Sequence, residues 1–259
     1  MQFRLTDDQI MIGDTASAFL SEVSSIQAVR NVMTTERGYD EAVWNRIVGE
    51  MGWTGTHIPE LFGGLSLGYI ELIIILEQMG KHLLCSPFFS SVCLAQNTVL
   101  IAGTESQKSK YLGRLAKGET GTLAYSSGGN RWDSTAVNAI FEKKQDDFIL
   151  NGEYSLVADG HTADLLVVAA REYQGSRLGL FMINSNQDGV IKKWQPSLDQ
   201  TRRQASVELK AVRTPLNSIL GEAESSAERL NTILNLATIG IAADQVGGTV
   251  NIDSNSVPV

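Results

Sequence analysis

The sequence predicts an α+β protein with an N-terminal α-helical bundle, an antiparallel β-barrel or sandwich domain and a single C-terminal helix. Two changes of hydrophobic period support this order. Apolar residues recur at helical spacing up to residue 118, alternate with polar residues from there to 216, and then return to helical spacing. We therefore expect a helical domain over 1–118, an antiparallel β-domain over 119–216, and a helix with a tail over 217–259.

The helical part is organised around a turn and the apolar helix that follows it. Pro59 disfavours helix at the residue before it, and Gly63-Gly64 permits a loop. Residues 69–79 are apolar nearly all round, which predicts a helix buried among helices and too short to span a bilayer. Thr6 and Thr104 begin capping boxes. The expected helices run over about 7–23, 41–51, 69–80, 87–102 and 105–117.

Short alternating runs between 119 and 216 predict the strands. Gln145-Asp146 is expected to turn between two of them, and Asn151-Gly152, a type I′ turn dipeptide, between the next two. The number and spacing of these runs favour a barrel or sandwich. The expected strands are 120–126, 137–141, 148–150, 153–157, 165–170, 178–183, 190–194 and 205–209.

The C-terminal part begins a helix after Glu222. Gly247-Gly248 is expected to end or interrupt this helix, and residues 251–259 lack both a period and good helix formers, so we expect a frayed tail. Without further helices to cover it, the helix should expose an apolar stripe. Such a stripe predicts oligomerisation or a bound partner.

Composition and charge exclude several classes of partner. Hydrophobic residues make up 43% and charged residues 19%, which is ordinary for a globular protein. A net charge of −8 without a basic patch argues against nucleic acid or an anionic membrane surface. Cys85 and Cys93 are too few for a disulfide framework or a zinc site, so no metal site is predicted. The N-terminus lacks a signal-peptide pattern, which predicts a cytoplasmic location.

Several segments resemble the acyl-CoA dehydrogenase family. The order of a helical bundle, a small β-domain and a long helix is also similar to that of the family. The resemblance runs from residue 3 to about 249. The matching segments are LTDDQ (5–9), PELFGG (59–64), DQTRR (199–203) and AADQVGG (242–248).

The resemblance implies a flavin enzyme. FAD would lie against the β-domain, a carboxylate would remove the α-proton of an acyl-CoA thioester, and the β-hydrogen would leave as a hydride. The family's flavin-proximal loop corresponds to SSGGNRWD (126–133) here. By this resemblance Asp133 is a substrate-binding residue. The implied cofactor-binding residues are Leu123, Tyr125, Ser126, Trp132, Leu156 and Ala158.

Two of these positions depart from the family pattern. Trp132 stands where the family has a small residue, so its indole should crowd a ligand; a loop tip without a ligand is the alternative reading. Ala158 stands where the family has a hydroxyl residue, so it cannot donate to a flavin. One lost hydrogen bond of about 0.5–1.5 kcal/mol weakens binding by only about tenfold. Leu156 can still pack on a ring.

The third departure is the length of the C-terminal part. The family continues with further helices that carry most catalytic bases, so the C-terminal helical domain is expected to be incomplete in this chain. A minority of relatives place the base on the first of these helices. Glu228 lies about half a turn from that position, and an exposed helix glutamate is the alternative reading.

The leading functional prediction is an acyl-CoA dehydrogenase-type oxidoreductase subunit of fatty acid or steroid side-chain metabolism, incomplete on its own. The alternative is a non-catalytic structural subunit of a heteromeric acyl-CoA dehydrogenase, with no flavin of its own. A third interpretation is a remnant that folds poorly. Flavin content separates the first from the second. A stoichiometric complex with a full-length relative separates the second from the third.

Overall fold

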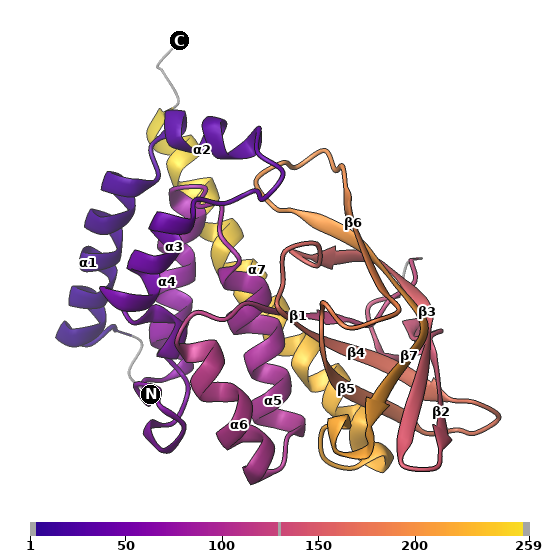
Figure 1. Ribbon diagram of the computed structural model, residues 1–259. Helices are drawn as coiled ribbons and strands as arrows, with labels where there is room; N and C mark the ends of the chain where they lie inside the picture. The colour runs from indigo at the N-terminus through magenta and orange to yellow at the C-terminus, as the bar shows by residue number, and fades with distance from the viewer. Residues whose placement is uncertain (1–3, 129–130, 256–259) are drawn as a thin grey trace.

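The chain folds into helices packed against one curled, mixed β-sheet. The computed structural model describes residues 4–128 and 131–255. In Figure 1, α1 to α6 lie on one side, the sheet lies on the other, and α7 runs diagonally across the molecule. This arrangement confirms the predicted α+β class. The α-helices are α1 (Asp7–Val23), α2 (Ile26–Met33), α3 (Glu41–Gly49), α4 (Tyr69–Lys81), α5 (Asn97–Ala102), α6 (Glu105–Ala116) and α7 (Ser226–Asn255).

The predicted helix starts have the expected caps. At the start of α1 the Thr6 hydroxyl accepts from the Gln9 N–H (3.2 Å), and the Gln9 carboxamide accepts from the Thr6 N–H (3.0 Å). Thr104 and Gln107 form the same box at α6. Helix α2 was not predicted from the sequence; Ser25 caps it by accepting from the Ala28 N–H. The short helices are η1 (Trp53–Gly55), η2 (Glu60–Phe62), η3 (Phe89–Gln96), η4 (Ser134–Ala136), η5 (Leu216–Ser218) and η6 (Ala223–Ser225).

The segment after Pro87 differs from the single helix predicted for it. Residues Phe89–Gln96 form the π-helix η3, which leads directly into α5. Its side chains from Ser90 to Gln96 are buried, and the Ser91 hydroxyl accepts from the Gly121 N–H at the start of the sheet (3.1 Å). The wider turn places two serines inside the molecule, where each has a hydrogen-bond partner.

The sheet is mixed, whereas the sequence predicted an antiparallel one. Its strand order is β1-β4-β2-β3-β7-β6, with β5 paired to β4. Strands β1 and β2 both run parallel to β4, because the chain leaves β1, forms the β2–β3 hairpin and then returns beside β1 in the same direction. The strands are β1 (Gly121–Ala124), β2 (Ile140–Lys144), β3 (Asp147–Ala158), β4 (Leu165–Glu172), β5 (Leu178–Asn184), β6 (Val190–Gln195) and β7 (Gln204–Pro215).

The predicted turn at Asn151-Gly152 is wrong. Strand β3 continues through both residues, and its register against β7 shifts there, as in a β-bulge. The Asn151 side chain accepts from the Ala211 N–H of β7 (2.7 Å), and a Cβ on Gly152 would lie 2.3 Å from that of Ala139. Because Ala139 lies so close, position 152 requires glycine. Asn-Gly often forms a turn, but in this protein it forms a β-bulge.

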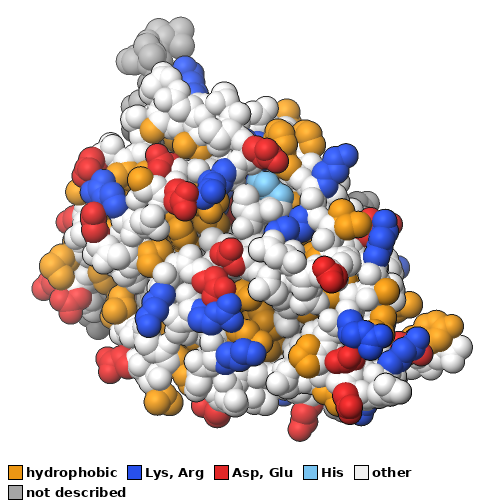
Figure 2. Space-filling view, viewed as in Figure 1, with side chains coloured by type: hydrophobic (Ala, Val, Ile, Leu, Met, Phe, Trp, Pro, Cys, Tyr) orange, Lys and Arg blue, Asp and Glu red, His pale blue; other side chains and the backbone are white. Residues whose placement is uncertain are grey.

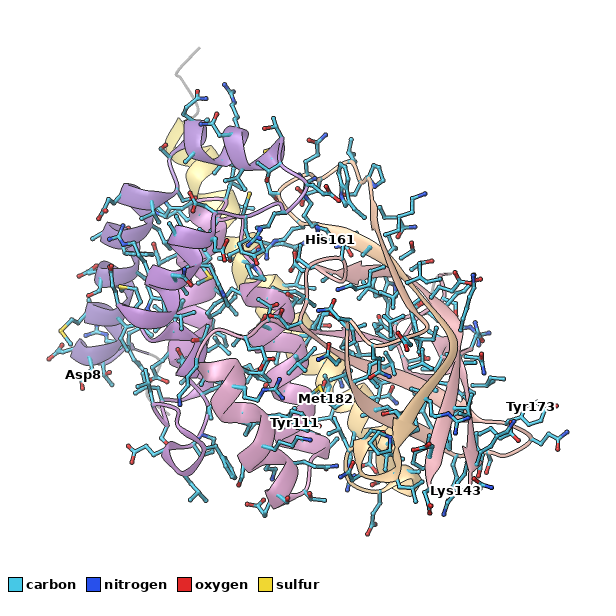
Figure 3. All side chains as sticks on the ribbon, viewed as in Figure 1. Asp8, Tyr111, Lys143, His161, Tyr173 and Met182 are labelled. Atoms are coloured by element: carbon cyan, nitrogen blue, oxygen red, sulfur yellow. The ribbon has the colours of Figure 1, made fainter. Side chains whose placement is uncertain are left out.

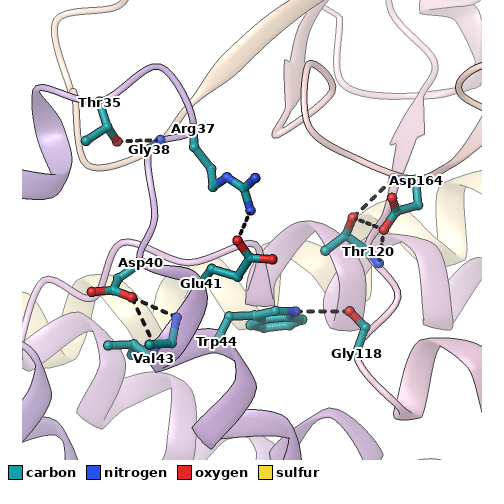
Figure 4. Close-up of polar contacts among 11 residues, drawn as sticks. Thr35, Arg37, Gly38, Asp40, Glu41, Val43, Trp44, Gly118, Thr120 and Asp164 are labelled. Carbon is teal, nitrogen blue, oxygen red and sulfur yellow. Dashed lines mark hydrogen bonds and ion pairs between the residues drawn. The ribbon is translucent and has the colours of Figure 1, made fainter.

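Polar contacts join the helices to the sheet. The Trp44 indole N–H donates to the Gly118 carbonyl (3.0 Å), and both the N–H and the hydroxyl of Thr120 donate to Asp164 (3.0 and 2.8 Å), as Figure 4 shows. The ring of His161 lies near the loop after α2, with Nε2 2.9 Å from the Glu36 carbonyl oxygen (Figure 3). An apolar cluster that includes Leu112, Leu165, Leu180 and Ile233 continues from the helices through the sheet to α7.

Helix α7 continues through Gly247-Gly248 to Asn255, which corrects the predicted end or break and the start of the predicted tail. Residues 256–259 of that tail lie outside the described residues. A Cβ on Gly247 would lie 1.8 Å from the Glu77 carbonyl oxygen of α4, so the glycine allows two helices to touch through their backbones. This tertiary contact outweighs the low helix propensity of glycine.

Figure 2 shows basic and acidic side chains interspersed over the face in view. No helix within residues 4–128 and 131–255 is both long enough and apolar enough to cross a membrane.

Candidate functional site

The residues predicted to bind the cofactor come from two strand ends and one loop. Leu123 lies in β1, Tyr125 and Ser126 follow it, and Leu156 lies near the end of β3. A hydrogen bond from the Ser155 N–H to the Ser126 carbonyl (2.9 Å) holds the two strand ends together. Five of the six residues line one small cavity of about 40 Å³. Those five are Leu123, Tyr125, Ser126, Trp132 and Leu156.

Two large apolar side chains project from this site. Trp132 is 75% exposed and Leu156 is 60% exposed. Leu156 has φ 57°, a left-handed conformation that is costly for a leucine, and its N–H donates to the Gln195 carboxamide (3.2 Å). A strained, solvent-facing leucine is a candidate for contact with a ligand.

Ser126 and Asp133, two of the predicted residues, make hydrogen bonds within their own loop. The Ser126 hydroxyl accepts from the Gly128 N–H (3.2 Å), inside the loop. Asp133 caps η4 by accepting from the N–H and hydroxyl of Thr135 (2.7 and 2.5 Å), and these bonds hold the pKa of its carboxyl below the usual range. Burial raises the pKa of Tyr125, and the Asp133 carboxylate adds to this effect. Asp133 is not among the residues that line the small cavity.

Ala158 and Glu228 lie apart from the small cavity. The Ala158 carbonyl accepts from the Thr122 hydroxyl (2.7 Å), and its side chain borders a second, larger cavity. Glu228 is exposed in the first turn of α7, where its carbonyl accepts from the Thr232 hydroxyl (3.1 Å). Glu228 is not among the residues that line either cavity.

The residues fit a flavin in part. Leu156 offers an exposed apolar surface on which one face of a planar ring can pack. The cavity bounded by Trp132, at about 40 Å³, is too small to enclose such a ring. Ala158 brings no polar side chain to the ring's edge. The site therefore offers an exposed apolar surface at Leu156, and Trp132 bounds the small cavity beside it.

The second cavity, of about 420 Å³, was not predicted as a site. It lies where the end of α4, η3, the end of β3, the loop 199–203 and α7 meet. Arg202 of that loop pairs with Asp244 of α7 (2.5 Å), so two segments that resemble the family by sequence meet here. The adjacent arginines Arg202 and Arg203 are visible in the sequence and could have drawn attention to this loop. Only the fold brings them beside Asp159 and Asp244.

The charges around this cavity are mostly held by protein partners. Arg203 is buried, donates to the Met33 and Thr35 carbonyls (2.7 and 2.5 Å), and lies over the Trp194 ring. Asp159 accepts from the hydroxyl of the buried Ser90 (2.7 Å). Burial raises the pKa of Asp159 to about 6, although the Ser90 hydroxyl and both arginines favour its charged form.

Comparison with known proteins gives the family. The family described as "Acyl-CoA dehydrogenase, N-terminal domain" matches residues 6–119. Mitochondrial isovaleryl-CoA dehydrogenase of Bos taurus is 31% identical over 172 residues, 64% of this chain and 40% of that protein. The mitochondrial short/branched chain specific acyl-CoA dehydrogenase of Bos taurus is 25% identical over 252 residues, 93% of this chain and 57% of that protein. The chain thus spans about half the length of these relatives.

A solved structure agrees with these matches over most of the chain. The Tcur3481-Tcur3483 steroid ACAD is 25% identical, with a TM-score of 0.82, over 95% of this chain and 65% of that chain. The helices, the curled sheet and the long α7 are thus shared with that protein. The family match over residues 6–119, the relatives and the shared fold together support the resemblance of this chain to the acyl-CoA dehydrogenase family.

Proposed function

We propose that the chain is an acyl-CoA dehydrogenase-type flavoprotein subunit that acts on a CoA thioester by α,β-dehydrogenation. One observation carries the proposal: five residues predicted to hold FAD line the same small cavity between the ends of β1 and β3. The relatives named for isovaleryl-CoA and short/branched-chain acyl-CoA support the substrate class. The division into domains at residues 118 and 216, and the cytoplasmic location, stay predictions.

When bound, FAD would supply the acceptor for the hydride that leaves the β-carbon. The side chains that would hold it are Leu156, through its exposed apolar surface, and Tyr125, which lines the same cavity. The Ser126 hydroxyl borders the site as well. Glu228 stays our proposed base for the α-proton, and Asp133 our proposed contact to the thioester; both carboxylates are exposed on the surface.

The visible absorbance of the purified protein, before and after FAD is added and unbound FAD is removed, tests the proposal. We expect a flavin band that loses intensity when a CoA thioester substrate is added. Trp132→Ser should raise the affinity for FAD several-fold, because the indole bounds a cavity that is too small for the ring. Leu156→Ala is the matched variant and should lower the affinity, because it removes the exposed apolar surface.

Two results would contradict this account. A protein that stays colourless with excess FAD, both as wild type and as Trp132→Ser, would exclude a flavin site in this chain. Equal FAD affinities for wild type and Trp132→Ser would show that the indole does not limit access.

The second candidate function is a non-catalytic subunit that pairs with a full-length relative. It is favoured by the absence of a polar side chain at Ala158 and by apolar residues that α7 leaves exposed, Ile239 and Val246. A colourless protein that co-purifies at a fixed ratio with a full-length relative would support this function over the first.

A further inference from the structure

The larger cavity has one apolar wall and one polar wall. Its apolar wall consists of Leu83, Leu84, Phe89 and Ile241. The polar part of its lining contains the charged groups already described around Asp159. At about 420 Å³ it has the size of a ligand site rather than that of a packing defect.

Most polar groups on the charged wall are already engaged. Arg202 is paired with Asp244, and Arg203 donates to two backbone carbonyls. The Asp199 carboxylate accepts from the N–H and the hydroxyl of Thr201 (2.9 and 2.7 Å). The two guanidinium groups therefore have protein partners and do not form an open anion site.

Asp159 differs from these groups. Its Oδ2 accepts from Ser90, while Oδ1 makes no hydrogen bond to the described residues and is not sealed inside the protein. Its backbone is fixed, because its N–H donates to the Arg203 carbonyl (2.9 Å) and its carbonyl accepts from the N–H groups of Thr162 and Ala163 (3.0 Å each). The carboxylate is thus a rigidly placed acceptor at the edge of an apolar cavity.

We propose that the cavity binds an apolar acyl group that carries a hydroxyl, and that Asp159 accepts the hydrogen bond from that hydroxyl. A carboxylate on the ligand would be repelled by Asp159, whereas an ammonium would lie beside Arg202 and Arg203 as well as Asp159, so the arginines would offset part of its attraction. A hydroxyl is neutral, donates to a carboxylate strongly, and suits an otherwise apolar chain or ring.

The cavity also lies beside the candidate cofactor site. Ala158 lines it, and Leu156, two residues earlier on β3, lines the smaller cavity. An acyl group in the larger cavity would thus lie near the strand end that carries Leu156. The inference rests on the proposed function in this respect, since it assigns the ligand to the acyl part of a CoA thioester.

The test compares binding of octanoyl-CoA with binding of hydroxyoctanoyl-CoA isomers whose hydroxyl lies in the distal half of the chain, by calorimetry on the FAD-supplemented protein. At least one isomer should bind wild type about tenfold more tightly than octanoyl-CoA, a ratio typical of one charge-assisted hydrogen bond. Asp159→Asn should reduce that preference to about threefold or less. Asparagine keeps the volume and tolerates the left-handed φ of 51° at this position.

Asp199→Asn is the matched control, because it lines the same cavity but its carboxylate is held within its own turn. It should leave the preference unchanged. No preference in wild type, or a preference that Asp159→Asn retains in full, would overturn the inference.

A second pair of probes separates this inference from the proposed function. If no CoA thioester binds, the proposed function fails, and free octanediol is then compared with free octanol by NMR titration of the same proteins. Tighter binding of the diol to wild type but not to Asp159→Asn would keep the assignment of Asp159 without CoA. Equal binding of the two alcohols would overturn it.

Discussion

Asp159 shows how one partly buried carboxylate can lower the stability of a fold while serving a site. Its left-handed backbone conformation is strained, and burial disfavours the charged form of its carboxyl group. The Ser90 hydroxyl and the two arginines favour the charged form. Such a combination is typical of residues retained for binding rather than for stability.

The pH dependence of stability should report this cost. Since the pKa of Asp159 is raised to about 6 in the fold, the folded protein binds the proton more tightly than the unfolded chain does. Its stabilising contribution is full below the unfolded pKa near 4 and is lost as pH rises through about 6. Relative to Asp159→Asn, the free energy of unfolding of wild type should fall by on the order of 2–3 kcal/mol between pH 4 and pH 7. Urea unfolding of both proteins across this range measures the difference, and parallel curves would contradict it.

At the scale of elements, α4 and α7 cross at glycines. A Cβ on Gly80 would lie 1.8 Å from the Asp244 carbonyl oxygen, and one on Gly247 would lie equally close to the Glu77 carbonyl oxygen. The same crossing borders the larger cavity, since Gly80 and Asp244 both line it. The position of α7, and with it the shape of the cavity, thus depends on the two glycines, Gly80 and Gly247.

Gly80→Ala and Gly247→Ala should each destabilise the protein by about 1–3 kcal/mol, because the helices must separate to admit the methyl group. Gly49→Ala in α3 is the control, since a Cβ there meets nothing within 4 Å, and it should be neutral or stabilising by up to about 1 kcal/mol. Thermal unfolding of the three variants and of wild type measures these changes in stability. Equal effects at all three sites would show that only helix propensity is involved.

At the scale of the whole molecule, α7 buries one face and exposes another. Leu230, Ile233 and Ala237 lie in the core, whereas Ile239 and Val246, one heptad apart, are 45% and 53% exposed. The exposed apolar positions agree with the expectation that this helix carries a stripe suited to another protein surface.

We expect the chain to self-associate through this stripe when no partner chain is present. Sedimentation velocity should show a species larger than the monomer, and Ile239→Glu with Val246→Glu should shift it to the monomer. Leu61→Glu is a control, because Leu61 is 82% exposed and lies in η2 rather than in α7. A monomeric wild type at high concentration would contradict self-association.

The sequence by itself determined the types of most elements, because caps and hydrophobic periods are local: Thr6, Thr104 and the run 69–79 need no distant partner to be recognised. It also placed Leu123, Tyr125, Ser126, Trp132 and Leu156 at one site, by their resemblance to a family. Only the tertiary structure decided the mixed pairing of β4, the bulge at Gly152 and the course of α7 through Gly247, since each depends on a contact with a residue far along the chain. The same holds for the cavity at Asp159: α4, the end of β3, the loop at Arg202 and α7 form it only after folding, and no short stretch of sequence contains that arrangement.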